Sequence, residues 1–211
     1  MSAEEAIQSE LPRDDGKNRV ILDAAATIIL RNGYRRSSMD AIAREAGVAK
    51  QTLYQHFGSK EALFGSLVTE RLRRIKATFQ PRPGAGDDPV DVLRALGRQV
   101  LDLALSPSSL ALHRVIVSEA PHFPELGRVS HDYGARAAVE ALAAYFDEQK
   151  ERGRLEIDDT ELAAEQFLGM LLGHFQLRAL LGVETRPSPE RLARAVDSAV
   201  RTFLAAYGKR A

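Results

Sequence analysis

The stretch from Ser37 to Lys60 constrains this chain most, because it predicts two short helices joined by a glycine turn. Ser37 and Asp40 have the spacing of a capping box, in which each side chain accepts a hydrogen bond from the other residue's backbone. Gly47 is expected to end the first helix, since glycine tolerates the positive φ of many helix C-caps. The small apolar face of that helix consists of Ala41, Ile42, Ala43 and Ala46.

The second helix of this stretch has a polar face and an apolar face. At 100° per residue, the polar face spans an arc of about 140° and consists of Lys50, Gln51, Tyr54 and Gln55. Leu53 and Phe57 lie outside this arc and are expected to face the first helix. Cations and amides are the groups that hydrogen-bond base edges in the major groove of DNA. The pattern predicts a DNA-reading helix, although an amphipathic helix pair of this kind is also common as plain core.

A second set of polar residues is placed to bond phosphate oxygens, which position a protein on DNA without reading its sequence. This predicted set comprises Ser38, Thr52, His56 and Lys60. Arg35 and Arg36 directly precede the helix pair. They either touch the DNA backbone or lie solvated in a loop, and the sequence favours neither reading.

With these residues the chain resembles the TetR family of transcriptional regulators. The resemblance runs from about Lys17 to Leu67 and rests on Gly33-Tyr34, Ser38-Met39, Ile42-Ala43, Ala46-Gly47-Val48, Thr52-Leu53-Tyr54, His56-Phe57 and Ser59-Lys60-Glu61-Ala62-Leu63. It implies a three-helix DNA-binding head, a helical body that binds a small molecule, a homodimer and a palindromic operator in double-stranded DNA. It also implies repression that ends when an apolar or amphipathic effector shifts the two heads apart.

Charge is unevenly distributed along the 211 residues, although the formal net charge is +0. From Arg13 to Lys60 there are nine Lys/Arg and five Asp/Glu residues, a net charge of +4, so the remainder carries −4. A basic head on an acidic body suits a protein that docks one end on phosphate. No run of about 18 apolar residues occurs, and the N-terminus lacks the regions of a signal peptide. We therefore expect a cytoplasmic protein without membrane contact.

The whole sequence predicts an all-α fold, with an N-terminal helix-turn-helix domain followed by a C-terminal helical domain. Residues 1–16 are expected to form a disordered tail, residues 17–62 the DNA-binding domain, and residues 63–211 the effector-binding and dimerisation domain. Pro81 is expected to end the helix that Ser59 begins, and one long helix is expected from Pro124 to about Arg152. Further helix starts are predicted at Asp88, Ser106, Asp158-Asp159 and Ser188.

The helix predicted from Leu162 to Leu181 is apolar around much of its girth, so it must be covered on more than one side. The rest of a helical domain of this size is able to cover it. A second copy of the chain is the other possibility. The family resemblance implies a homodimer through the last two helices.

Aromatic, methionine and histidine residues of the C-terminal domain are candidates for an effector pocket. They are His113, Ile116, Tyr133, Phe146, Phe167, Met170, His174 and Phe175. For each of them ordinary core packing is the commoner reading, because aromatic and methionine residues at helical spacing are core far more often than they line a pocket. Cysteine is absent, and the sequence has no phosphate-binding glycine loop, nucleophile elbow or metal-ligand spacing, so we predict no enzyme activity, metal or cofactor. The alternative function is a helical adaptor that has lost DNA binding, against which the Lys and Gln side chains of the second helix argue.

Overall fold

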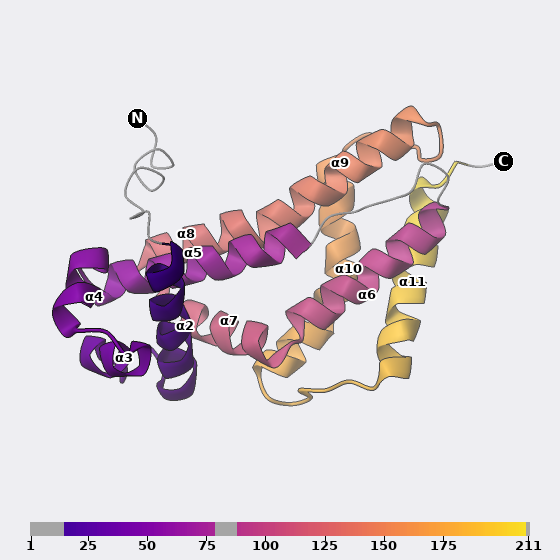
Figure 1. Ribbon diagram of the computed structural model, residues 1–211. Coiled ribbons are helices and arrows are strands. Elements are labelled where there is room, and N and C mark those ends of the chain that lie inside the picture. The colour runs from indigo at the N-terminus through magenta and orange to yellow at the C-terminus, as the bar shows by residue number, and fades with distance from the viewer. Residues whose placement is uncertain (1–14, 79–87, 210–211) are drawn as a thin grey trace. The chain divides into compact units, whose positions relative to one another are not determined.

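The computed structural model describes residues 15–78 and 88–209, which form helices and their connections (Figure 1). The predicted tail, apart from its last two residues, and the predicted helix end at Pro81 lie outside these ranges. The all-α prediction is confirmed. Within the described residues, the only extended pairing is an isolated β-bridge between Leu155 and Gly208.

The chain divides into two compact units, Met1–Glu70 and Arg71–Ala211. The helices of the first unit are α2 (Asp15–Asn32), α3 (Met39–Ala46), α4 (Lys50–Phe57) and the first half of α5 (Lys60–Thr78). Gly33 ends α2 with a φ of 79°, and the Ser59 side chain caps α5 by accepting a 3.1 Å hydrogen bond from the Ala62 N–H. The end of α2 at Gly33 and the start of α5 at Ser59 agree with the helix boundaries predicted from the sequence.

The first unit is built around a small apolar core. α2 and α3 pack closely together, and α3 packs on α4. Residues without exposed side-chain surface come from all four helices: Ile21, Ala25, Ile29, Ile42, Leu53, Leu63, Phe64 and Val68. On α4, Leu53 is fully buried, whereas Gln51, Tyr54 and Gln55 are exposed, so the helix is covered on one side only.

The second unit contains α6 (Pro89–Ala104), α7 (Pro107–Glu119), α8 (Pro124–Ser130), the π-helix η1 (His131–Arg136), α9 (Ala137–Glu151), α10 (Thr160–Leu180) and α11 (Pro189–Tyr207). Four of these helices begin with a side-chain cap. The capping residues are Asp88, Ser106, Asp159 and Ser188, each of which accepts a hydrogen bond from the backbone two or three residues later. Their positions confirm the helix starts predicted from sequence.

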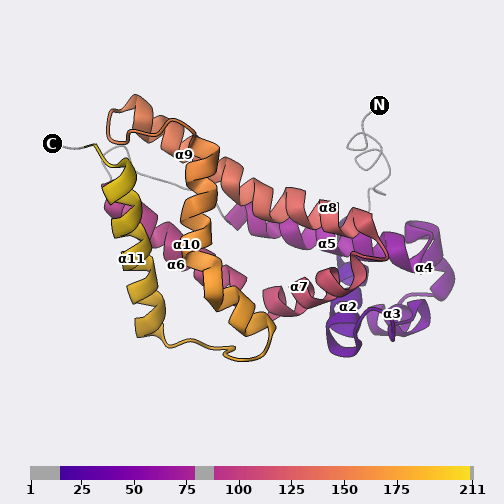
Figure 2. The same cartoon turned by 180° about the vertical axis from the view of Figure 1, so that it is seen from behind.

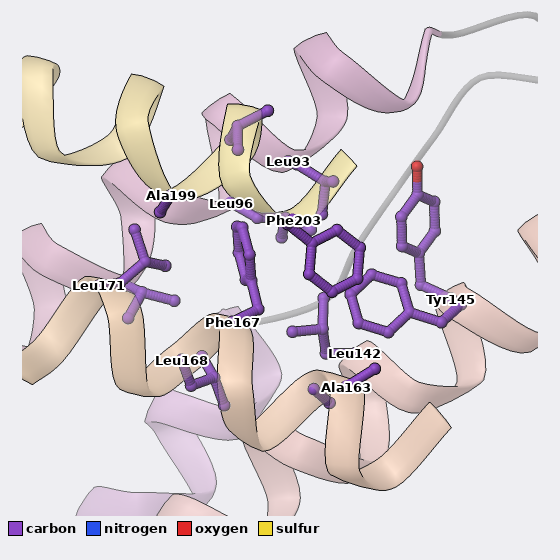
Figure 3. Packing of buried hydrophobic residues seen from close by; sticks show 14 of the residues in the cluster. Leu93, Leu96, Leu142, Tyr145, Ala163, Phe167, Leu168, Leu171, Ala199 and Phe203 are labelled. Atoms are coloured by element: carbon purple, nitrogen blue, oxygen red, sulfur yellow. The ribbon is translucent and has the colours of Figure 1, made fainter. Parts of the chain in front are cut away.

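Aromatic side chains form the centre of the second unit (Figure 3). The rings of Phe146 and Phe203 stack with 4.7 Å between centroids, and Phe167 meets Phe203 edge-on at 5.4 Å. All three are essentially unexposed. They connect α9, α10 and α11, and leucines from α6 complete the cluster.

Two departures from regular α-helix were not predicted. The expected single helix from Pro124 to Arg152 is helical backbone throughout, but six residues, His131–Arg136, form a π-helix within it. α10 changes direction at Gly173, whose φ of 19° and ψ of −120° break the helix (Figure 2). Glycine at this position removes the steric barrier that a side chain would add to such a backbone conformation.

No single helix among the described residues is long and apolar enough to cross a membrane. The pair α6 and α7, bent by 62° at the break between them, passes that test together on length and composition alone.

Candidate nucleic-acid interface

The turn between α3 and α4 has the geometry of a helix-turn-helix. Gly47 adopts a φ of 65°, and its N–H donates to the Arg44 carbonyl at 3.2 Å. The Val48 N–H donates to the Ala43 carbonyl at 3.0 Å. These bonds satisfy the last carbonyls of α3 and set the direction in which α4 leaves.

The residue that caps α3 is Ser38, so the predicted capping role of Ser37 is wrong. Ser38 Oγ accepts a 3.2 Å hydrogen bond from the Ala41 N–H. Ser37 is buried, and its hydroxyl donates instead to the Gly33 carbonyl at 2.7 Å. The sequence places two serines side by side, and burial of the first leaves the second to cap the helix.

The outward face of α4 is polar and accessible. Gln51 and Gln55 are exposed, and Tyr54 has 43 % of its surface exposed. Thr52 is partly exposed beside them. Leu53 anchors the helix from the other side, so these side chains project from a fixed backbone. Amide groups displayed on a short anchored helix have the form required to read base edges in a major groove.

Lys50, the first residue of α4, is held by an acidic residue of α3. Its Nζ lies 2.8 Å from Asp40 Oδ1, and both side chains are 58 % exposed. The hydrogen bond from Lys50 to Asp40 is the largest cause that raises the pKa of Lys50 above its ordinary value. The same ammonium lies 5.9 Å from the centre of the Tyr54 ring. Lys50 is therefore exposed but already paired.

His56 is partly buried, with its ring 6.3 Å from that of Phe57. Its Nδ1 is buried and has no hydrogen-bond partner. A contact between His56 and phosphate therefore depends on the other ring nitrogen.

Lys60 has a different environment from the other residues of the predicted phosphate set. Its Nζ donates to the carbonyls of Tyr34 and Ser37, each at 3.1 Å. The ammonium also lies 4.2 Å from the centre of the Tyr34 ring. Two of the three N–H donors of the ammonium are thus committed inside the head.

Comparisons with known proteins agree with this geometry. Residues 91–209 match the family described as AefR-like transcriptional repressor, C-terminal domain, and residues 21–67 match the family described as bacterial regulatory proteins, tetR family. The chain belongs to the TetR family. It is therefore a DNA-binding transcriptional regulator of the helix-turn-helix type, as the sequence predicted.

Solved structures resemble this TetR-family regulator over nearly its whole length. A TetR-family transcriptional regulator from Mesorhizobium loti is 32 % identical, with a TM-score of 0.87, over 94 % of this chain and 100 % of the other. The flavonoid-responsive regulator FrrA is 34 % identical, with a TM-score of 0.80, over 93 % of this chain and 100 % of its own. The uncharacterized regulator YezE of Bacillus subtilis is 25 % identical over 69 % of this chain and 76 % of its own.

The eight predicted effector residues of the TetR-family regulator are divided between the core and the surface of its second unit, and Phe175 packs against the aromatic centre. Phe146 and Phe167 lie in the aromatic centre of the second unit. Met170, which is 39 % exposed, and His174 lie on the exposed side of α10. The others are buried or partly buried on α7, η1 and α10: Ile116, His113, Tyr133 and Phe175.

The structure defines the surroundings of three of these candidates. Burial lowers the pKa of His113 below its ordinary value. The Tyr133 ring lies 5.9 Å from the Arg73 guanidinium, and the Phe175 ring lies 5.2 Å from that of Arg191. Among the described residues, no group of three or more His, Asp or Glu side chains is arranged to hold a metal ion.

Sequence reasoning missed the two residues that restrain the predicted DNA contacts. Asp40 was interpreted only as part of a helix cap, yet it pairs with Lys50 across the turn. Tyr34 was noted only as a family residue, yet it is buried under the Lys60 ammonium. The Asp40–Lys50 pair had a usable signal in the sequence, namely opposite charges on either side of a short glycine turn. The Tyr34–Lys60 contact had none, because the two residues are 26 positions apart.

Proposed function

We propose that this regulator is a homodimeric repressor that reads a palindromic operator with α4 and leaves it when a small amphipathic molecule binds the helical body. The supporting observation is the exposed polar face of α4, with Gln51, Tyr54 and Gln55 projecting from a helix that Leu53 anchors in the core. A twofold dimer presents two such helices to two half-sites about one turn of DNA apart.

Gln51, Gln55, Tyr54 and Lys50 are the proposed base contacts. Ser38, Thr52 and His56 are the proposed phosphate contacts, because they lie at the edge of the α4 surface or at the start of α3. Lys60 belongs to neither group on geometric grounds, since its ammonium bonds two backbone carbonyls.

The experiment that tests DNA reading begins with a binding site selected by the protein from a pool of random duplexes. Gln51→Ala is expected to cost roughly 1–3 kcal/mol on that site and little on random DNA, because an amide is lost from a base edge. Thr52→Val is the matched control. Because Thr52 is a proposed phosphate contact, this variant should weaken binding to both duplexes by the same factor. Equal losses on both duplexes for Gln51→Ala would contradict the assignment.

The proposed dimer surface is the exposed side of α10, together with α11. Leu162, Met170 and Leu177 on α10 are 47, 39 and 51 % exposed. Exposed apolar side chains that gather on a protein surface mark an interaction site, and α10 carries these three on both sides of its break at Gly173. Leu177→Glu should convert the dimer to a monomer in analytical ultracentrifugation and abolish binding to the selected site. An unchanged dimer would place the interface elsewhere.

The proposed effector is an amphipathic aromatic molecule. The support is the similarity to FrrA, whose name describes it as flavonoid-responsive, and the half-buried aromatic and histidine side chains of α7, η1 and α10. A ligand releases DNA only when it binds more tightly to the conformation whose heads do not fit the operator. A panel of flavonoids should therefore weaken binding to the selected site, and Tyr133→Ala should reduce this response without changing binding in the absence of ligand.

A further inference from the structure

The two carbonyls that Lys60 binds belong to one tight turn. Tyr34 and Ser37 are its first and last residues, and the Ser37 N–H donates to the Tyr34 carbonyl at 3.1 Å. The Lys60 ammonium donates to the carbonyls of both residues, so it is hydrogen-bonded to the two ends of the turn. One cation thereby fixes the connection between α2 and α3.

The first residue of the turn is locked by the start of α5. Tyr34 has only 5 % of its surface exposed, and its ring lies 4.9 Å from that of Phe64. Its hydroxyl donates to Glu61 Oε1 at 3.2 Å. The Tyr34 ring thus packs against α5, while the Lys60 ammonium sits over its face. Contacts of this kind between a cation and an aromatic ring contribute most when they are partly desolvated.

The last residue of the turn is held by the end of α2. Ser37 is 4 % exposed, and its hydroxyl donates to the Gly33 carbonyl. Ser38, which caps α3, follows immediately. The position of the turn therefore sets where α3 begins.

The two central residues of this turn are Arg35 and Arg36, and both are exposed. Arginines ahead of a helix-turn-helix are well placed to bond phosphate oxygens. Their backbone position depends on the turn, and the turn is held at both ends by Lys60. The lysine is therefore linked to the DNA contacts through the backbone.

We propose that Lys60 is a positioning residue, which clamps the Tyr34–Ser37 turn and so presents Arg35 and Arg36 to the DNA backbone, and does not itself bind phosphate. This inference rests on the proposed function. A phosphate contact that drew the ammonium away would break its bonds to the carbonyls of two buried residues, Tyr34 and Ser37, and the loss of such bonds in a buried setting is costly.

The test is a double-mutant cycle measured on a random duplex of about 30 base pairs, long enough for two half-sites. One arm is Lys60→Met, which removes the charge and the donors but keeps the length of the side chain. The other arm is the pair Arg35→Gln and Arg36→Gln. Arg44→Met is the matched control, because Arg44 is an exposed cation of the head whose Nε bonds to the Asp40 carbonyl and not to the turn.

Positioning predicts that the two arms are not additive. Lys60→Met should weaken binding about tenfold in the wild-type background and by less than about twofold where both arginines are already glutamine. In that second background the slope of log K against log salt should not change further. Arg44→Met should change affinity by the same factor in both backgrounds. Lys60→Arg should bind DNA about as tightly as the wild type, because a guanidinium keeps the donors and the contact with the Tyr34 ring.

Direct phosphate contact predicts a different pattern, and that pattern would overturn the proposal. Lys60→Met would then lower affinity by the same factor in both backgrounds and reduce the salt slope by about 0.9 for each head. If Lys60→Met does not fold, Lys60→Gln is used instead, since it removes the charge while keeping a donor for the turn. Positioning then predicts that most of the binding is retained, whereas direct phosphate contact predicts the same loss in both backgrounds.

A second measurement separates this proposal from the proposed function. Amide hydrogen exchange of Ser37 in the absence of DNA should be about tenfold faster in Lys60→Met, because the turn loses its clamp. Failure of the wild-type protein to bind any DNA would refute the proposed function and leave this result intact. Unchanged exchange at Ser37 would refute the clamp whether or not DNA is bound.

Discussion

Replacing Asp40 by asparagine tests whether the paired state of Lys50 limits its use on DNA. The substitution removes one negative charge from α3 and deletes the partner that lies 2.8 Å from the Lys50 ammonium. It keeps the size of the side chain. Glu45→Gln is the matched control, because Glu45 is another exposed acid of α3. Both variants change the net charge of the head by the same amount, and only the first releases Lys50.

The expected magnitude follows from the exposure of the pair. With 58 % of each side chain in solvent, the pair contributes little to stability. Its effect is on counterions: when Lys50 turns to DNA in the wild-type protein, one cation leaves the DNA, but the freed Asp40 carboxylate takes up a cation, so the net release is small. In Asp40→Asn no carboxylate takes up a cation, and the net release grows by one for each head. The salt slope should become steeper by about 0.9 for each head, or about 1.8 for a dimer.

The assay is fluorescence anisotropy on a random duplex and on the selected site, from about 50 to about 200 mM salt. Across that range the dimer of Asp40→Asn should lose about tenfold more affinity than the wild type. Its binding to random DNA should be stronger at low salt, so the ratio of specific to random binding should fall. Adding Lys50→Ala to Asp40→Asn should reverse both effects. If Asp40→Asn and Glu45→Gln gave the same salt slope, the reasoning would be refuted. The change in slope would then come from the altered net charge of the head and not from the release of Lys50.

Three further predictions concern the second unit. Tyr145→Phe should leave stability in urea unchanged or raise it by about 1 kcal/mol, because the hydroxyl is buried without a partner and burial raises the pKa of Tyr145 to about 12; a clear loss would reveal a bonded hydroxyl. Burial lowers the pKa of His113 below 6.5, so the histidine should cost no stability above that pH, destabilise the fold increasingly as pH falls from 6.5 toward the lowered pKa, and add no further loss below it. The stability curve of His113→Asn should be flatter there, and parallel curves would contradict this. Gly97→Ala should destabilise by about 1–3 kcal/mol, since its Cβ would lie 3.0 Å from Val196 Cγ1. Gly65→Ala, with nothing within 4 Å, should be neutral or stabilising, and equal melting shifts would contradict both expectations.

Helix boundaries were largely predictable because their signals are local. Asp88, Ser106, Asp159 and Ser188 each bond backbone groups within three residues, so the sequence alone carries the geometry. The polar face of α4 was predictable for a similar reason, since Leu53 at one side of a short helix leaves the other side to solvent. Where two adjacent residues share the capping chemistry, as Ser37 and Ser38 do, only tertiary burial decides between them.

The interruptions inside helices had no such local signal. The segment His131–Arg136 is polar and carries one glycine, a composition equally compatible with α-helix. Gly173 breaks α10, whereas Gly169 lies in the same helix without breaking it. The same residue type therefore has two outcomes four positions apart, and the residue type alone does not distinguish them.

Lys60 illustrates why the role of a residue is harder to predict than its location. The family resemblance and the side-chain chemistry both suggested a phosphate contact, and a cation at the start of α5 fits that role. The carbonyls that hold its ammonium lie 23 and 26 residues earlier in the chain, and they are brought together only when Tyr34 is buried against Phe64. A lysine facing DNA and a lysine facing its own backbone have the same sequence signature. The difference is whether the fold brings backbone acceptors to the ammonium, and in this head it brings two, the carbonyls of Tyr34 and Ser37.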